Sequence, residues 1–258
     1  MLLTERQQHE VAVYDTRSAG VLAAVSEADL RVEDGIPFPH VEHRDFLADA
    51  ISRIQPLAGR RMLECGCGPG HLSVYFARQG ADLSAVDISS GNILLCQRRA
   101  QANGVRVNYR AQPVETLDYP DATFDIIFGN QVFHHLEREA AAANLRRMLK
   151  PGGIAVFCEP VLLVRWARSF RETPLMLKFL PTWRDTPDER SLTQADLAVL
   201  RRHFCRFRYT PYQVFTRLHR LLPIQARGQQ RLMAFDRWAI AHVPGAGRWA
   251  RWAVIELG

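Results

Sequence analysis

The stretch Leu63-Glu64-Cys65-Gly66-Cys67-Gly68-Pro69-Gly70 decides the fold, because it joins a short apolar strand to a helix through a glycine turn. We expect residues 61–65 to form this strand and residues 70–79 to form this helix. Glycines at such a turn let the backbone approach a ligand closely, and the first N–H groups of the helix face that ligand. The next strand, 82–87, ends in Asp87. An acid at this place can accept hydrogen bonds from both hydroxyls of an adenosine ribose, so the order of these features predicts a site for an adenosine-containing ligand.

The spacing of the glycines distinguishes two kinds of ligand. Dinucleotide-binding folds use Gly-x-Gly-x-x-Gly, which brings a pyrophosphate to the helix N-terminus. Here the third glycine, Gly70, comes one residue early, and His71 stands where that pattern needs glycine or alanine. Glu64 beside the turn would repel phosphate and attract an ammonium group, directly or through water. The turn therefore favours a ligand without phosphates and disfavours a dehydrogenase.

Strand and helix periodicities alternate along the chain, and this alternation predicts the architecture. Strands are expected at 61–65, 82–87, 105–109, 124–129, 154–158, 206–209 and 252–257. Helices are expected at 4–27 with Thr4 as its cap, and at 41–55, 70–79, 89–103, 137–149, 193–204 and 229–242. The pattern predicts an α/β fold: a doubly wound, Rossmann-like, mostly parallel sheet of seven strands with an antiparallel last strand.

The length of 258 residues fits one large domain with an attached cap better than two independent domains. We expect residues 1–55 to form an N-terminal helical cap, with Tyr14 as part of a lid. Residues 56–258 would form the ligand-binding domain, with cap insertions at about 160–190 and 213–247. These insertions would roof the site with aromatic and arginine side chains, or would merely shield the bound ligand.

Composition excludes some classes of protein. Hydrophobic residues make up 47% and charged residues 23% of the chain, as in globular proteins. The longest apolar candidate for a membrane span, 154–164, is interrupted by Glu159 and Pro160, and the N-terminus lacks the pattern of a secretion signal. Five cysteines are an odd count, and Cys65 and Cys67 stand too close in a tight turn to pair. A reducing cytoplasm is the expected location.

The second part of the chain is basic and aromatic. Residues 160–258 hold 17 Lys/Arg against seven Asp/Glu, together with all five tryptophans. This composition is typical of contact with nucleic acid, an anionic membrane surface or an acidic substrate, and also of a solvated arginine face over an aromatic core. Residues 214–222 set apolar side chains on one face of a helix and Arg217 and Arg220 toward the other, so this helix either packs on its own domain or contacts anionic lipid.

Several segments between residues 61 and 159 resemble the class I methyltransferases that depend on S-adenosylmethionine (SAM). The sequences of these motifs are similar to those of the group that contains quinone C-methyltransferases and small-molecule O- and N-methyltransferases. The resemblance rests on residues 63–70, Val86-Asp87-Ile88-Ser89, Phe124-Asp125-Ile126-Ile127, Val132-Phe133-His134-His135-Leu136 and Leu149-Lys150-Pro151-Gly152-Gly153. It implies SAM as the cofactor. It also implies that Gly66, Gly68 and Gly70 wrap the methionine part, Asp87 holds the ribose, Ile88 lies against the adenine and the Asn130 backbone lies near the sulfonium.

One segment departs from the group. Members often carry an aspartate after the third strand, near the adenine amino group, where this chain has Gln112-Pro113-Val114. The amide oxygen of Gln112 can accept the same hydrogen bond, and Val114 would lie beside the adenine. Glu64 is expected to contact the SAM ammonium; the alternative is a structural pairing with a backbone donor.

Three residues are candidates for catalysis. Methyl transfer is an in-line displacement, and it needs a base only when the acceptor must lose a proton. His134 and His135 follow the fourth strand at the ligand-binding edge, where a histidine can act as that base or can position structure or substrate. Glu159, at the end of the fifth strand, is the second candidate base. No metal is expected, because the Cys65-Cys67 spacing is not that of a zinc site and no carboxylate cluster marks another metal.

Missing motifs narrow the acceptor. The chain reads Asn130-Gln131-Val132-Phe133 where amine methyltransferases of nucleic acids carry a motif like Asn-Pro-Pro-Tyr, and Cys158 does not follow a proline as in base C5-methyltransferases. A small-molecule acceptor is therefore favoured and nucleic acid disfavoured. The alternatives are a lipid-like acceptor at a membrane surface, or a non-catalytic module that binds SAM or a nucleotide.

Overall fold

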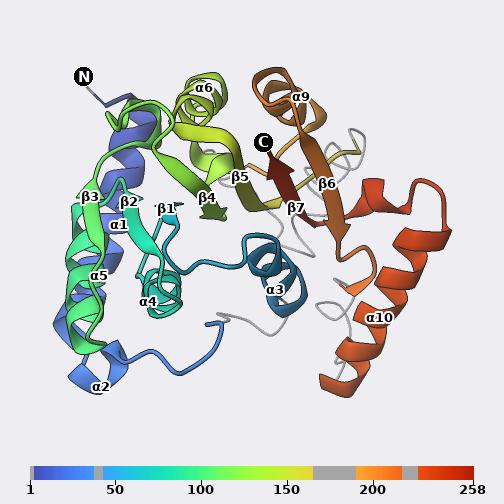
Figure 1. The fold of residues 1–258 in the computed structure, drawn as a ribbon. Coiled ribbons are helices and arrows are strands. Elements are labelled where there is room, and N and C mark those ends of the chain that lie inside the picture. Colours follow the sequence, from blue (N-terminus) through green and yellow to red (C-terminus); the bar gives the residue numbers. More distant parts are fainter. Residues whose placement is uncertain (1–2, 38–42, 165–189, 217–225) are drawn as a thin grey trace.

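The computed structural model describes residues 3–37, 43–164, 190–216 and 226–258. Its centre is a seven-stranded sheet in the order β3-β2-β1-β4-β5-β7-β6 (Figure 1). Strand β7 pairs antiparallel with both β5 and β6, whereas the other neighbours pair parallel. The predicted doubly wound sheet with an antiparallel last strand is thus confirmed. The strands are β1 (Arg61–Cys65), β2 (Asp82–Asp87), β3 (Asn108–Ala111), β4 (Phe124–Asn130), β5 (Leu149–Pro160), β6 (Phe207–Tyr212) and β7 (Trp252–Leu257).

Helices cover both faces of the sheet (Figure 1). The α-helices are α1 (Glu5–Ala24), α2 (Glu27–Leu30), α3 (Arg44–Arg53), α4 (His71–Arg78), α5 (Ser90–Ala102), α6 (Arg138–Met148), α9 (Gln194–His203) and α10 (Ala226–His242). In the described part of the chain, the connections contain the short 3-10 helices η2 (Val114–Thr116), η3 (Phe133–His135) and η6 (Ala246–Trp249). Thr4 caps α1 as predicted: its side chain accepts a hydrogen bond from the Gln7 backbone, and the Gln7 side chain accepts one from the Thr4 backbone.

Alternate residues of the inner strands point into two different apolar cores. Leu63 and Ile127 pack in one cluster, and Met62 and Ile126 pack in the other, with all four fully buried. Successive side chains of a strand point to opposite faces, so burial of both sets requires cover on both sides of the sheet. The short apolar runs of the sequence are the signature of this arrangement.

Two strand boundaries differ from the prediction. β3 begins at Asn108 rather than at residue 105, because Val105 still donates to the carbonyl of Ala100 and closes the end of α5 around Gly104 at φ +64°. β5 begins at Leu149 rather than at residue 154, because Leu149 already pairs with Phe124 across a register shift.

Helix α1 packs closely along α5 at one edge of the molecule (Figure 1). Asp15 of α1 accepts hydrogen bonds from Ser89 Oγ at 2.5 Å and from the Gly91 N–H at 3.0 Å. A side chain at Gly91 would collide with Ser18 of α1, so glycine permits this close approach. The N-terminal helix is therefore fixed beside the start of α5, next to Asp87.

The predicted insertions are described only in part. Residues 165–189 and 217–225, which include Arg217 and Arg220, lie outside the described residues. Helix α10 packs against β6, the edge strand opposite α1 (Figure 1). Among the described residues, no helix is long and apolar enough to cross a membrane.

Candidate active site

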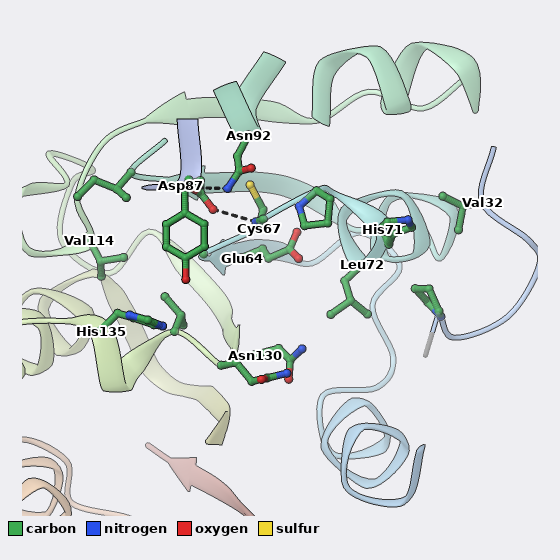
Figure 2. A pocket seen from close by; sticks show the side chains of 18 of the residues that line it. Val32, Glu64, Cys67, His71, Leu72, Asp87, Asn92, Val114, Asn130 and His135 are labelled. Carbon is green, nitrogen blue, oxygen red and sulfur yellow. Dashed lines mark hydrogen bonds between the residues drawn. The ribbon is translucent and has the colours of Figure 1, made fainter. Parts of the chain in front are cut away.

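A cavity of about 680 Å³ opens at the carboxyl ends of β1, β2 and β4. Its walls come from α1, from residues 31–37, from the glycine turn and from residues 112–115 and 130–136. Figure 2 shows the Glu64 and Asp87 carboxylates on one side of this space and the His135 ring on another. Most of the predicted cofactor residues line the cavity together: Glu64, Gly66, Gly68, Asp87, Ile88, Gln112, Val114 and Asn130.

Asp87 is held rigidly at the end of β2. One carboxylate oxygen accepts the Gly68 N–H at 2.8 Å, and the other accepts the Ser89 N–H at 2.9 Å and the Asn92 side-chain amide at 3.2 Å. Burial raises the pKa of Asp87, although these hydrogen bonds act in the opposite direction. A carboxylate offers about four acceptor positions, so at least one stays free for a ligand hydroxyl.

Glu64 lies at the end of β1, where the sheet meets the cavity. It is 3% exposed, and Ser73 Oγ donates a hydrogen bond of 2.5 Å to it. Burial raises the pKa of Glu64 to about 8, and the nearby Asp87 carboxylate adds to the rise, while the Ser73 hydrogen bond opposes it. A ligand ammonium would favour the charged form of both acids, so this end of the cavity suits a cationic amino group.

The glycines of the turn have different roles. A Cβ atom at Gly66 would meet Val132 Cγ2 at 2.5 Å, so Gly66 is required by packing of the turn against the residues after β4. Gly68 has φ +50°, and a Cβ built there meets no atom within 4 Å. The space above Gly68 belongs to the cavity, which therefore lets a ligand approach the Gly68 backbone.

Gly70 requires a correction to the sequence prediction. It does not line the cavity; it is the N-cap of α4 at φ +80°, and a Cβ there would meet Cys96 Sγ at 2.8 Å. Its conformation and its contact with α5 explain the glycine without any cofactor contact.

Gln112, Ile88 and Val114 line another part of the cavity. The Gln112 side-chain amide donates to the Thr116 carbonyl at 2.6 Å, which fixes the side chain and leaves its amide oxygen as the acceptor. The Ile88 and Val114 side chains give this part of the cavity apolar surface. Asn130, at the end of β4, has a buried Oδ1 without a hydrogen-bond partner among the described residues, and a bound ligand can supply the missing donor.

Glu159 and His134 do not lie at the cavity, which corrects their predicted role as bases. Glu159 is 0% exposed and accepts the N–H groups of Val132 at 3.0 Å, Phe133 at 2.7 Å and His134 at 3.3 Å. His134 Nδ1 lies 2.7 Å from the same carboxylate. The pair fixes the loop after β4 from beneath, because four donors occupy the carboxylate.

His135 lies at the cavity with a carboxylate partner that the sequence did not reveal. Its Nδ1 is 3.0 Å from an oxygen of Glu10 in α1, and the Tyr14 ring meets the imidazole edge-on at 6.2 Å between centroids. Glu10 and Tyr14 also line the cavity, together with Gln7. Residues 7, 10 and 14 share one face of α1, and the available sequence signal was the placement of Gln7 and Glu10 on that face.

The predicted roof is only partly described. Helix α1 and residues 31–37 line the cavity, and Tyr14 is among the lining residues, whereas its role in a lid stays a prediction. No described residue beyond Leu136 lines the cavity, so the described part of the two insertions contributes no wall. The division into a 1–55 cap and a 56–258 domain stays a prediction.

The amino-acid sequence matches a known domain over its central part. Residues 63–157 match the methyltransferase domain family. A ubiquinone biosynthesis O-methyltransferase of Azorhizobium caulinodans is 36% identical over 143 residues, which is 54% of this chain and 54% of that protein. The chain thus spans about half the length of the curated relatives it matches.

Solved structures share the fold over the whole chain. The geranyl diphosphate C-methyltransferase of Streptomyces coelicolor, at 14% identity, has a TM-score of 0.60 and is covered over 97%, with 98% of this chain aligned. The cyclase SpnF, at 20% identity, also has a TM-score of 0.60 and is covered over 96%, with 100% of this chain aligned. A cyclase shares the fold, so the fold alone does not fix the reaction. Residues 63–157 thus carry the match to the methyltransferase domain family, and this part of the chain also supplies the two acids and the open glycine of the cavity.

Proposed function

We propose that the protein transfers a methyl group from SAM to a small-molecule acceptor without the help of a metal ion. The observation that carries the proposal is the single cavity into which Glu64, Gly68, Asp87 and His135 all open. Asp87 would hold the ribose, Glu64 the ammonium and Gln112 the adenine amino group. SAM supplies a methyl group on a positively charged sulfur, which is reactive without further activation.

We further propose that the accepting atom is a hydroxyl oxygen and that His135 removes its proton. The matched relatives are named as O-methyltransferases of ubiquinone biosynthesis, which supports a phenolic acceptor for this chain. Two described imidazoles, those of His71 and His135, line the cavity. Burial and the nearby Arg99 guanidinium lower the pKa of His71 to about 4, which makes it a weak base, whereas His135 has a carboxylate partner and a neutral imidazole is a suitable base near neutral pH. The alternative role of His135 is to orient the acceptor by a hydrogen bond.

The test combines binding and turnover. Calorimetry with SAM measures binding, and transfer of a radiolabelled methyl group measures turnover on a panel that includes a short-tailed phenolic ubiquinone precursor. We expect His135→Gln to keep the affinity for SAM and to lower kcat by about 100-fold or more, the usual contribution of a general base. His203→Gln, on the exposed side of α9, is the control. Binding of SAM without turnover on any acceptor would favour the non-catalytic module instead.

We also propose that the protein contacts a membrane surface. Phe215, Phe235 and Trp238 form an aromatic patch with exposed fractions of 37%, 46% and 52%. The rings follow one another at centroid distances of 5.2 and 5.7 Å, and Arg231 and Arg237 are exposed on the same helix, α10. Exposed aromatic rings beside arginines are typical of helices that lie on anionic lipid. A lipid-like acceptor would make such contact useful.

Vesicle flotation tests this contact. Vesicles of phosphatidylglycerol and phosphatidylcholine should bind the protein at low salt and release it at high salt. Phe235→Ser with Trp238→Ser should abolish binding, whereas Leu94→Ser, which removes an exposed side chain of α5, should not. Absence of binding at low salt would refute the membrane contact and leave the methyltransferase proposal intact. Five free thiols support a cytoplasmic location as part of the same proposal.

A further inference from the structure

The side chain of His135 contacts helix α1, whereas its backbone belongs to another element, η3. The backbone belongs to η3, whose preceding N–H groups are held by the buried Glu159 carboxylate. The ring, by contrast, has Glu10 as its polar partner, at 3.0 Å from Nδ1. Both side chains are mostly buried, with exposed fractions of 13% for His135 and 8% for Glu10. The ring of His134 also packs against this imidazole, at 4.1 Å between centroids, so the polar contact that can orient the two nitrogens comes from α1, 125 residues away in the sequence.

Helix α1 is held firmly enough to act as a support. Asp15 binds Ser89 and Gly91 at the start of α5, and Ser89 in turn donates its N–H to Asp87. Near its other end, Arg6 pairs with Glu137 at 3.1 Å, directly before α6. The helix thus connects the corner of the cavity that holds Asp87 with the corner that holds His135.

We propose that Glu10 is a positioning residue that sets the orientation and the tautomer of His135. A carboxylate only accepts hydrogen bonds, so Nδ1 must carry the proton and Nε2 keeps its lone pair. Among the described residues, Nε2 has no hydrogen-bond partner, so it is available to a ligand. The inference rests on the proposed role of His135 as the base.

Transfer of the acceptor proton to His135 would give Glu10 a second role. When the acceptor oxygen forms its bond to the methyl carbon of SAM, the bond from that carbon to the sulfonium sulfur would break and S-adenosylhomocysteine would leave. The hydroxyl proton would pass to Nε2, so that the imidazole becomes positively charged. The Glu10 carboxylate at 3.0 Å stabilises this charge in a mostly buried site, where electrostatic interactions are stronger than in water. An amide at the same position would accept or donate equally well and would carry no charge, so it would fix neither the tautomer nor the charged ring.

Heteronuclear NMR of the histidine ring nitrogens tests the proposal on the free protein, without any acceptor. We expect His135 of the wild type to show the tautomer with the proton on Nδ1. Glu10→Gln should convert this signal to a mixture of tautomers, and Glu5→Gln, at an exposed position on the same helix, should leave it unchanged. A wild-type ring protonated on Nε2, or an unchanged tautomer in Glu10→Gln, would overturn the proposal.

Kinetics and binding complete the test. With the phenolic probe that turns over, Glu10→Gln should lower kcat by about tenfold or more at unchanged KM for SAM, since only part of the base contribution is lost. Calorimetry should give the wild-type affinity for SAM. A weakened affinity with an unchanged tautomer would make Glu10 a cofactor contact and refute its positioning role.

The two proposals fail in different ways. If His135→Gln keeps full activity, the base assignment is wrong regardless of Glu10. If His135→Gln removes activity while Glu10→Gln keeps it and keeps the tautomer, only the inference about Glu10 is wrong.

Discussion

Replacement of Glu64 by glutamine should stabilise the protein without ligand and weaken its binding of SAM. The carboxyl is fully buried and its pKa rises from 4.5 to about 8, chiefly because burial disfavours the charged form. Glutamine keeps the size of the side chain and can still accept the Ser73 hydrogen bond of 2.5 Å. Glu64→Gln therefore removes the charge and little else.

The magnitude follows from the shift in pKa. Each pKa unit corresponds to about 1.4 kcal/mol, so the rise from 4.5 to about 8 gives a full cost on the order of 5 kcal/mol. Because the folded pKa is raised, stability is highest below the unfolded pKa of 4.5 and is lost as the pH rises toward about 8. Glu64→Gln should be more stable than the wild type, and this difference in unfolding free energy should grow by about 2–3 kcal/mol from about pH 6 to about pH 9.

Denaturant melts at the two pH values, compared between wild type and Glu64→Gln, measure this difference directly. Other groups titrate in both proteins and cancel. The affinity of the wild type for SAM should rise with pH up to about 8, because binding releases the Glu64 proton to the buffer. Glu64→Gln should bind SAM more weakly by about 1–3 kcal/mol and should lose this pH dependence. A stability difference that does not change with pH, or equal binding by both proteins, would refute the reasoning.

Two other perturbations test the cavity and its chemistry. Gly68→Val should abolish SAM binding, because its side chain would enter the open space above a backbone at φ +50°; Gly104→Val, at φ +64° with open space away from the cavity, controls for backbone strain. Normal binding by Gly68→Val would exclude this turn as the cofactor site. Methyl transfer should survive dialysis against EDTA, because the proposed base is an imidazole rather than a metal-bound group. Loss of activity that Mg²⁺ restores would contradict the metal-independent mechanism.

The sheet, and the gathering of Glu64, Gly68 and Asp87 at one cavity, could be predicted from the sequence because their determinants are local. Residues 63–70 and Asp87 lie within one strand-turn-helix-strand unit, and parallel strands bring their carboxyl ends to one edge. The roles of Gly66 and Gly70 were less accessible. Both have positive φ angles, but the atoms that exclude a Cβ come from Val132 and Cys96, which only the fold brings near.

The catalytic end could not be read from the sequence for the same reason. His134 and His135 are neighbours in the chain, yet one pairs with Glu159 below the loop and the other with Glu10 at the cavity. The three N–H groups that occupy Glu159 belong to a loop 25 to 27 residues earlier in the chain. Neither pairing could be predicted from the periodicity or the spacing of residues in the sequence. Side-chain contacts between distant elements depend on how those elements pack.

The most direct test of the central claim, that this cavity binds SAM, is calorimetric titration of SAM into wild type and Asp87→Asn. Asparagine keeps the size of the side chain and removes the charge, and Asp82→Asn, at the exposed start of the same strand, is the matched control. The account predicts binding by the wild type and by Asp82→Asn, with a loss of about 1–3 kcal/mol in Asp87→Asn, the range for a charge-assisted hydrogen bond. Equal affinity in all three proteins, or no binding by the wild type, would contradict it.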